Sequence, residues 1–406
     1  MENKDEIIMP QSYEAGVIIV DETGKFGYKS LQEAVNAASP GQTIYVKKGI
    51  YRESVSINKS LIIEGESFSN THFINVGMYG FVIEDAVEVL ISNITINIRS
   101  GIGIKLTSNL QLSTARLDRV IISGRGLMGA SYAITAAGKN VKCAMNQCTV
   151  KNKISWGIKA SDGAEVKIKD SIISAVMCVD ASDDGTVVSS EHTIYTPWSA
   201  KVTRGITADN KSSVILQNNS FLGFTRAIHA AHGAQVQLLG NKFEGNKIWC
   251  IYADDKGTKV SVYNNSFVEN RPAKKTDRLT ERVKIRADYL TSACIWAEKG
   301  AELDISSNSF ENNFHCIDIR DLETYANISL NKFVDNRIYE AYDNLVKNII
   351  AQTGNHVDHA VIVRNGASIC VKNNEFIRNG ICQVVVEHSD KAESKIEESD
   401  NVYVNL

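Results

Sequence analysis

The sequence has 406 residues with a formal net charge of −3, and its scattered charges lack the basic stripe that nucleic-acid-binding proteins usually carry. Hydrophobic residues make up 43% of the chain, yet no apolar run approaches the roughly 18 residues needed to cross a bilayer. Eight cysteines without framework spacing, together with a polar start that does not resemble a secretory signal, predict reduced thiols and a cytoplasmic location.

The first predicted element is a capping helix. After a polar tail over residues 1–16, residues 30–42 read as a helix followed by a Pro-Gly turn. Ser30 and Glu33 match the capping box of a helix start, and apolar residues then follow at helical spacing. An open stack of strands needs such a cap, because its end would expose apolar core and unpaired strand edges.

This opening region resembles a known family. The segments Ser-Leu-Gln-Glu-Ala-Val (30–35), Ile-Tyr-Val-Lys-Lys-Gly-Ile-Tyr-Arg-Glu-Ser-Val (44–55) and Leu-Ile-Ile-Glu-Gly (61–65) are similar to the start of pectin methylesterases. More broadly, they resemble the pectate-lyase-like (pectin lyase-like) superfamily. The resemblance implies a right-handed parallel β-helix and carbohydrate-active relatives.

The catalytic signatures of those relatives are missing. The pectin methylesterase signatures Gly-x-x-Asp-Phe and Gly-Arg-Pro-Trp do not occur, and Thr196-Pro197-Trp198 is only a partial match to the second. The chain has Asp254-Asp255 and His232-Gly233, but in the reverse of the polygalacturonase order and without Arg-Ile-Lys. No acidic cluster with the spacing of a pectate lyase calcium site is present. The activity therefore does not follow from the resemblance.

A repeat runs from about residue 90 onward: a small residue followed by Ile-x-Ala, a glycine turn, an alternating strand and Asn-x-Phe, often with asparagine three residues later. Its alternation predicts short strands, and its period of 22 to 28 residues predicts a solenoid. The clearest copies end on Phe221, Phe243, Phe267, Phe310, Phe333 and Phe376. Weaker copies place Thr95, Ile121, Thr149, Ile172 and Ile194 at the same position.

The predicted fold is all-β: one single-stranded right-handed parallel β-helix domain over residues 1–406, with about 11–13 coils. The coils should occupy residues 43–390 and leave a C-terminal segment over 391–406. Two longer intervals in the repeat indicate insertions over residues 271–291 and 337–357. Like residues should then stack above like, about 4.8 Å apart.

Two predicted columns have a structural role. Stacked asparagine amides can bond along a column, and turn glycines supply positive φ. The asparagine column comprises Asn93, Asn219, Asn241, Asn265, Asn308, Asn331 and Asn374. The glycine column comprises Gly138, Gly163, Gly185, Gly233, Gly257, Gly300 and Gly366.

Two other columns should point outward. The x position of the Ile-x-Ala strand reads Thr135, Lys159, Asp180, Thr207, His229, Tyr252, Trp296, Asp318 and Ile362. The position just before that strand reads Tyr132, Trp156, Met177, Arg204, Arg226, Trp249, Ala293, His315 and His359. Three of the four tryptophans fall in these columns, which is more aromatic surface than an ordinary strand needs.

This face is the candidate site. The predicted ligand-binding residues are Trp156, Lys159, Arg226, Trp249, Tyr252 and Trp296. His229, His315 and Asp318 can move protons and are the candidate catalytic residues. We expect these side chains to lie exposed together, bordered by the two insertions, the first of which is basic. No metal or cofactor is predicted.

The leading hypothesis is binding of an extended, acidic carbohydrate along the aromatic face. Flat apolar rings suit sugar faces, and the basic insertion suits an acidic glycan. If the protein is catalytic, a lyase, hydrolase or epimerase reaction fits best; the sequence leaves open whether it is an enzyme. The alternative is a non-catalytic intracellular scaffold that recognises a protein or peptide on the same face. Neither reading involves nucleic acid or a membrane, and the oligomeric state is not indicated.

Overall fold

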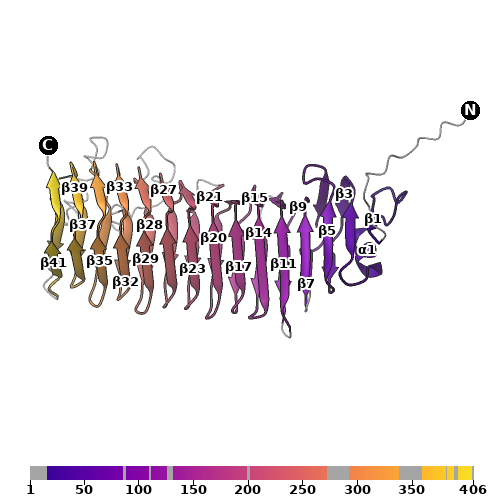
Figure 1. Cartoon of the computed structure of the whole chain (residues 1–406), viewed down its shortest axis with the longest axis horizontal. Helices are drawn as coiled ribbons and strands as arrows, with labels where there is room; N and C mark the ends of the chain where they lie inside the picture. The colour runs from indigo at the N-terminus through magenta and orange to yellow at the C-terminus, as the bar shows by residue number, and fades with distance from the viewer. Residues whose placement is uncertain are drawn as a thin grey trace, which may run out of the picture.

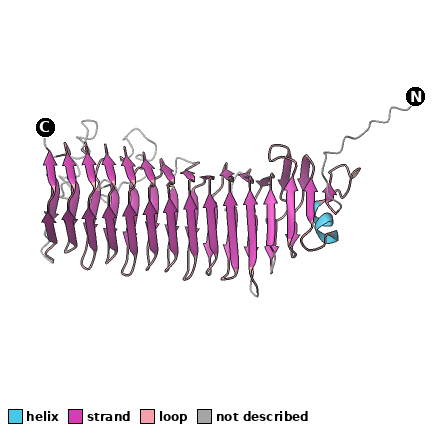
Figure 2. Cartoon of the chain, in the orientation of Figure 1, coloured by secondary structure: helices cyan, strands magenta, loops and turns pink. Residues whose placement is uncertain are grey.

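The structure is a computed structural model that describes residues 16–85, 88–108, 111–125, 131–198, 202–271, 292–337, 359–380, 382–387 and 392–404. It is an elongated solenoid of about 14 turns, with α1 (Leu31–Ala37) at one end and β41 (Lys395–Ser399) at the other (Figure 1). Strands run along its whole length (Figure 2). Each turn contributes one strand to each of three parallel sheets, so the solenoid predicted from the repeat is confirmed, with slightly more turns than the 11–13 coils expected.

The first sheet has 15 strands, and its inward residues alternate with outward ones, as in Lys259–Tyr263. Its strands are β1 (Ile18–Val20), β2 (Thr43–Val46), β5 (Leu61–Gly65), β8 (Glu88–Ser92), β11 (Ser113–Asp118), β14 (Val141–Asn146), β17 (Glu165–Lys169), β20 (Val187–Glu191), β23 (Ser213–Gln217), β26 (Gln235–Leu239), β29 (Lys259–Tyr263), β32 (Glu302–Ser306), β35 (Tyr325–Ser329), β38 (Ser368–Lys372) and β41.

The second sheet has 14 short strands, and its central residues point into the core. Its strands are β3 (Gly49–Arg52), β6 (Thr71–Ile74), β9 (Thr95–Ile98), β12 (Ile121–Gly124), β15 (Thr149–Lys151), β18 (Ile172–Ser174), β21 (Ile194–Thr196), β24 (Ser220–Leu222), β27 (Lys242–Glu244), β30 (Ser266–Val268), β33 (Ser309–Glu311), β36 (Lys332–Val334), β39 (Glu375–Ile377) and β42 (Val402–Val404).

The third sheet has 13 strands and contains the predicted site residues. Its strands are β4 (Val55–Ile57), β7 (Tyr79–Glu84), β10 (Gly101–Thr107), β13 (Ser131–Ala137), β16 (Trp156–Ser161), β19 (Met177–Ala181), β22 (Arg204–Ala208), β25 (Arg226–Ala230), β28 (Trp249–Asp254), β31 (Ala293–Glu298), β34 (Ile317–Arg320), β37 (His359–Arg364) and β40 (Cys382–Glu387).

Helix α1 covers the first turns with its apolar face, as predicted. The Ser30 hydroxyl accepts a hydrogen bond from the Glu33 backbone N–H at 3.2 Å, which confirms the N-cap. The Glu53 carboxylate accepts from the backbone N–H groups of Leu31 and Gln32, so a negative charge lies at the positive end of the helix. In the described part of the chain, no helix has the length and apolarity needed to cross a membrane.

A stack of phenylalanines fills the core beneath the second sheet. Successive ring centroids are 4.6–5.0 Å apart, and the rings are nearly parallel. All six phenylalanines named in the repeat are 0% exposed, which confirms that this position points inward. Tyr195 continues the stack toward the N-terminus at 4.9 Å from Phe221.

Two ladders of asparagine amides join the turns. In the first, each Nδ2 donates to the next Oδ1 at 2.9–3.2 Å, from Asn219 through Asn241, Asn265, Asn308, Asn331 and Asn374 to Asn401. In the second, the asparagines three residues after phenylalanine bond in the same way, from Asn246 through Asn270, Asn313 and Asn336 to Asn379. The ladders satisfy polar groups that the turns bury.

The strand register corrects the weaker copies of the repeat, because the inward position in each lies one residue later than predicted. The predicted residues were Thr95, Ile121, Thr149, Ile172 and Ile194. Phe221 pairs with Tyr195, and Tyr195 pairs with Ile173. Ile173 and Tyr195 are 0% exposed, whereas Ile172 and Ile194 are 43% and 41% exposed. Each copy has two adjacent residues that could fill an inward site, and a slip of one residue moves a side chain to the other face.

The turns show one further correction and one confirmation. Asn93 is not part of the ladder, because its φ of 56° places it in the left-handed turn position that Asn218 and Asn264 occupy in later turns. All seven predicted turn glycines have φ between 79° and 117°, as expected.

The coils continue past residue 390, where the prediction ended them, since β41 pairs with β38. The two predicted insertions lie almost entirely outside the described residues.

Candidate functional site

The strand register aligns the predicted site residues on the outer face of the third sheet. The first column runs through Thr135, Lys159, Asp180, Thr207, His229, Tyr252, Trp296, Asp318 and Ile362. The second column runs through Tyr132, Trp156, Met177, Arg204, Arg226, Trp249 and Ala293. Both columns match the sequence prediction over these residues, whereas His315, predicted for the second column, lies just before β34.

His229 is held in place by an aspartate and an aromatic ring. Its Nε2 lies 3.0 Å from Asp254 Oδ1, and its ring stacks on Tyr252 at 4.8 Å between centroids. Burial alone would raise the pKa of Asp254, but His229 and Lys299 outweigh that effect and lower it. Asp254 therefore stays a carboxylate that accepts a hydrogen bond from Nε2–H of His229, and Nδ1 is the ring nitrogen outside this contact.

A second acid lies beside this pair. The Tyr252 hydroxyl contacts Asp254 Oδ2 at 3.2 Å and Glu298 Oε1 at 2.8 Å. The Trp296 indole N–H donates to Glu298 Oε2 at 2.9 Å. Lys299 Nζ lies 3.1 Å from Asp254 and 3.2 Å from Glu298, so one ammonium group bridges both carboxylates. These side chains form one connected network on the sheet.

The aromatic rings of this network pack against arginines. The Arg226 guanidinium lies 4.7 Å from the Trp249 ring, and the Arg320 guanidinium lies 3.6 Å from the Trp296 ring. The ring centroids of Trp249 and Tyr252 are 4.7 Å apart. Trp249 and Tyr252 are both half-buried. This is an arrangement that can hold a flat or charged ligand.

Asp318 lies at the centre of a buried ionic cluster. Arg320 donates to both of its oxygens at 2.9 and 2.7 Å, and Arg364 donates to Oδ2 at 3.1 Å. Burial would raise the pKa of Asp318, but the two guanidinium groups hold it well below its usual range. Asp318 is 0% exposed and Arg364 is only 3% exposed. An ionised carboxylate bound this way does not readily give or take a proton.

His315 is also buried, at 3% exposed, and its Nε2 lies 3.1 Å from the Ile317 carbonyl oxygen. Burial lowers the pKa of His315 to about 4, against the opposing pull of Asp318. The imidazole is therefore neutral in the folded protein at neutral pH and out of reach of a surface ligand.

We expect His315 to make the protein acid-sensitive. Below a pH of about 6.5 the unfolded chain binds a proton at this position and the folded chain does not, so stability should fall between about pH 6.5 and about 4, by at most about 3 kcal/mol. His315→Gln cannot titrate and should lose less stability over this range. Urea unfolding at pH 7 and pH 4.5 measures the effect, and equal losses in both proteins would contradict it.

The N-terminal half of the face has a second aromatic pair. Tyr132 and Trp156 stack with centroids 4.8 Å apart and an interplanar angle of 15°, and both are half-buried. Asp180 follows Lys159 in the first column. Burial raises the pKa of Asp180, with further contributions from Asp209 and Asp183, although Lys159 and Arg204 act in the opposite direction. Charged side chains thus lie between two aromatic clusters.

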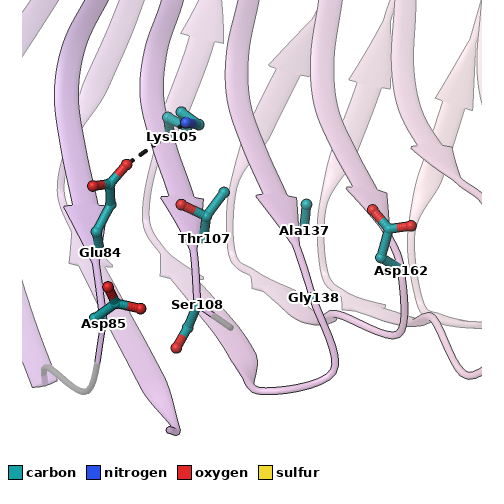
Figure 3. Close-up of a pocket in the computed structure, with 8 residues that line it drawn as sticks. All are labelled: Glu84, Asp85, Lys105, Thr107, Ser108, Ala137, Gly138 and Asp162. Atoms are coloured by element: carbon teal, nitrogen blue, oxygen red, sulfur yellow. Dashed lines mark ion pairs between the residues drawn. The ribbon is translucent and has the colours of Figure 1, made fainter. Parts of the chain in front are cut away.

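A depression of about 430 Å³ continues the face toward the N-terminal end (Figure 3). Its lining residues are Glu84, Asp85, Lys105, Thr107, Ser108, Ala137, Gly138 and Asp162. Lys105 pairs with Thr135 of the first column, and its Nζ lies 3.6 Å from Glu84 Oε1. With three carboxylates against one ammonium group, this end of the face favours hydroxyl groups over acidic ones.

Comparison with known proteins agrees with this architecture. Residues 113–267 match the family described as "Right handed beta helix region". The catalytic unit of a thermostable GH87 alpha-1,3-glucanase from Streptomyces thermodiastaticus is similar, with a TM-score of 0.53 and 10% identity over 97% of this chain and 70% of the glucanase. The fold is a right-handed parallel β-helix. The fold implied by the pectate-lyase-like resemblance is thereby confirmed.

Other solved structures resemble the β-helix more weakly. A mannuronic acid specific polysaccharide family 6 lyase from human gut microbiota has a TM-score of 0.43 and 11% identity over 94% of this chain and 83% of the lyase. Pectin methylesterase from carrot has a TM-score of 0.40 and 12% identity over 63% of this chain and 85% of the esterase. No curated protein matches the sequence.

The β-helix corrects the expectation that all site residues are exposed. Trp296 is 4% exposed, and His315 and Asp318 are buried with it. The predicted alternation is correct, because Trp296 and Asp318 lie in the outward column. However, outward side chains pack on one another here, and Arg320 covers the Trp296 ring at 3.6 Å. His229, Arg226, Trp249 and Tyr252 are half-buried, as are Trp156 and Lys159.

Sequence reasoning missed a third outward column. It contains the charged partners Asp254, Glu298, Arg320 and Arg364, each two residues after a member of the first column. The signal was present, because strand alternation brings residues i and i+2 to the same face. Extending the same column reading by two residues would have found all four.

Proposed function

We propose that the outer face of the third sheet binds an extended carbohydrate chain that carries acidic groups. The observation that supports this most is the pair of half-buried aromatic clusters, Tyr132–Trp156 and Trp249–Tyr252, on one flat parallel sheet. Four strand spacings separate β16 from β28, which corresponds to about 19 Å. A ligand that contacts both clusters must therefore be extended.

The side chains between the clusters suit an acidic sugar. Arg204 and Arg226 occupy neighbouring strands in the second column, and Thr207 and His229 occupy the same strands in the first. Guanidinium groups bind carboxylates in two-point contacts, and hydroxyl and imidazole groups can pair with sugar hydroxyls. The similar alpha-1,3-glucanase is, by its description, a carbohydrate-acting enzyme; that likeness establishes the fold, while the rings and charges carry the proposal.

If the bound carbohydrate is processed, His229 is the described group best placed to move a proton. Asp254 fixes the Nε2 side of its ring and leaves Nδ1 as the base. His315 and Asp318 are less suitable, because both are buried and Asp318 is neutralised by two arginines. A lyase, hydrolase or epimerase reaction would each need such a base.

We expect Trp249→Ala to weaken carbohydrate binding at least tenfold, because the change removes the ring that completes the second cluster. A glycan array identifies the ligand, and titration calorimetry then measures the affinity of the variant. Tyr263→Ala is the matched control, because Tyr263 is 51% exposed on the first sheet and should leave binding unchanged.

The same experiment separates the carbohydrate proposal from its alternative. A pull-down from lysate should be run beside the array. If no glycan binds and a protein partner is retained in a Trp249-dependent manner, the face is a protein-recognition surface and the carbohydrate proposal is wrong.

A further inference from the structure

Trp198 is an exposed tryptophan that is held rigidly outside the three columns of the third sheet. It follows β21, and its indole N–H donates to the Ile154 carbonyl oxygen at 2.5 Å, 44 residues earlier in the chain. The bond spans two turns of the helix, yet the residue remains 39% exposed. A ring fixed at its polar edge and partly exposed is preorganised for a ligand, because little side-chain freedom is lost on binding.

Two cations lie beside this ring. A depression of about 590 Å³ is lined by Trp198, Arg125, Lys153, Asn152 and Gly124. Arg125 and Lys153 are exposed, and neither takes part in an ion pair with any residue that the structure describes. The described lining residues are therefore basic and include no carboxylate, in contrast to the acidic depression of Figure 3.

The backbone fixes the position of these groups. Arg125 Nε donates to Asn97 Oδ1 at 3.1 Å, which orients the guanidinium group and leaves its two terminal nitrogens available. Asn152 and Lys153 are consecutive left-handed residues with φ of 56° and 50°. A Cβ at Gly124 would lie 2.5 Å from the Asn152 carbonyl oxygen, so glycine allows the two turns to approach closely.

We propose that this depression binds one acidic sugar residue, with its ring face on Trp198 and its carboxylate or sulfate group on Arg125 and Lys153. The inference rests on the proposed function and deepens it, because it places the acidic group of the ligand. Lys153 lies three residues before Trp156, so the depression adjoins the Tyr132–Trp156 cluster at the start of β16. A carbohydrate chain that binds at Trp198 can therefore continue along the outer face of the third sheet.

The local charge favours an acidic glycan over a nucleic acid. Nucleic-acid binding rests on many phosphate contacts along a basic stripe. Among the residues that the structure describes, two cations line the depression, and the protein as a whole has a net charge of −3. One ring and two cations match a single acidic sugar.

The test uses three defined hexasaccharides and the full chain. One is a hexa-uronate, and the second is its methyl ester, which keeps the rings and removes the charge. The third is a sulfated hexasaccharide built from sugars that have no carboxylate. We expect at least one charged probe to bind at least tenfold more tightly than the methyl ester in calorimetry. The preference for the charged probe should shrink as the salt concentration is raised, because salt screens the charges. A comparison of the two charged probes shows whether the site prefers a carboxylate or a sulfate group.

Variants assign the effect to the site. Arg125→Ala and Lys153→Ala should each reduce the preference for the charged probe at least fivefold, while Trp198→Ala should weaken the charged and esterified probes alike. Lys151→Ala is the matched control, because this exposed lysine on β15 does not line the depression. Thermal melting verifies that each variant is folded.

The outcomes separate this inference from the proposed function. If the probes bind and Trp249→Ala weakens them, but Arg125→Ala and Lys153→Ala leave the preference for charge unchanged, the face binds carbohydrate and this subsite is wrong. If none of the probes binds, both proposals fail for these sugars. Binding of the methyl ester with equal affinity would overturn the assignment of an acidic group.

Discussion

Replacing Phe267 by alanine should lower the free energy of unfolding by about 3–5 kcal/mol. Phe267 is 0% exposed and stacks between Phe243 and Phe310, with ring centroids at 4.9 and 4.6 Å. Alanine removes the ring from a column whose backbone spacing is fixed by parallel pairing, so the neighbouring rings cannot close the cavity. Urea unfolding followed by circular dichroism measures the loss.

Tyr263→Ala provides the comparison within the same turn. Tyr263 lies only four residues earlier, but it is 51% exposed and its loss should change stability by less than about 1 kcal/mol. If Phe267→Ala were as mild as Tyr263→Ala, the phenylalanine column would not be the core element that the register indicates.

Replacing Asp318 by asparagine should be as damaging, at about 3–5 kcal/mol. The change keeps the shape of the side chain but removes the carboxylate that pairs with the largely covered Arg320, and it leaves the buried Arg364 with Glu387 alone. The loss arises mainly from these less well compensated charges. Urea unfolding at pH 7 measures it, well above the range in which Asp318 could take up a proton.

Asp335→Asn is the matched control for Asp318→Asn, because it also removes one carboxylate charge. Asp335 also forms a two-point pair with an arginine, Arg378, but the side chains are 23% and 41% exposed. An exposed pair contributes about 0–1 kcal/mol, so this variant should remain nearly as stable as the parent. A stable Asp318→Asn protein with altered ligand binding would instead return Asp318 to the candidate catalytic residues.

Much of the fold could be predicted because every turn repeats the same physical requirement. Phenylalanine at the inward position, asparagine two residues before it and glycine at the turn each give a separate signal of the register. Where phenylalanine is replaced by an aliphatic residue, as at Ile172 and Ile173, both neighbours fit the inward site equally well. The register there is set by pairing with the adjacent turns, which local sequence does not contain.

From the sequence, the candidate site could be predicted only as columns of aligned residues. Strand alternation placed His229, Tyr252 and Trp296 in line, as the structure confirms. Their exposure could not be derived, because it depends on partners from other turns, such as Arg320 over the Trp296 ring. The position of Trp198 could not be predicted from the repeat, since its contact with Ile154 crosses two turns and follows no periodicity.

The asparagine ladders have a consequence for how the chain reaches this structure. Their rungs join residues 22 to 27 positions apart, or 43 where an insertion intervenes, in a chain of 406. Relative contact order is therefore low for an all-β protein, and no pairing between distant parts of the chain has to form first. Folding can begin at any turn and spread outward one turn at a time, with each new asparagine finding a partner already in place.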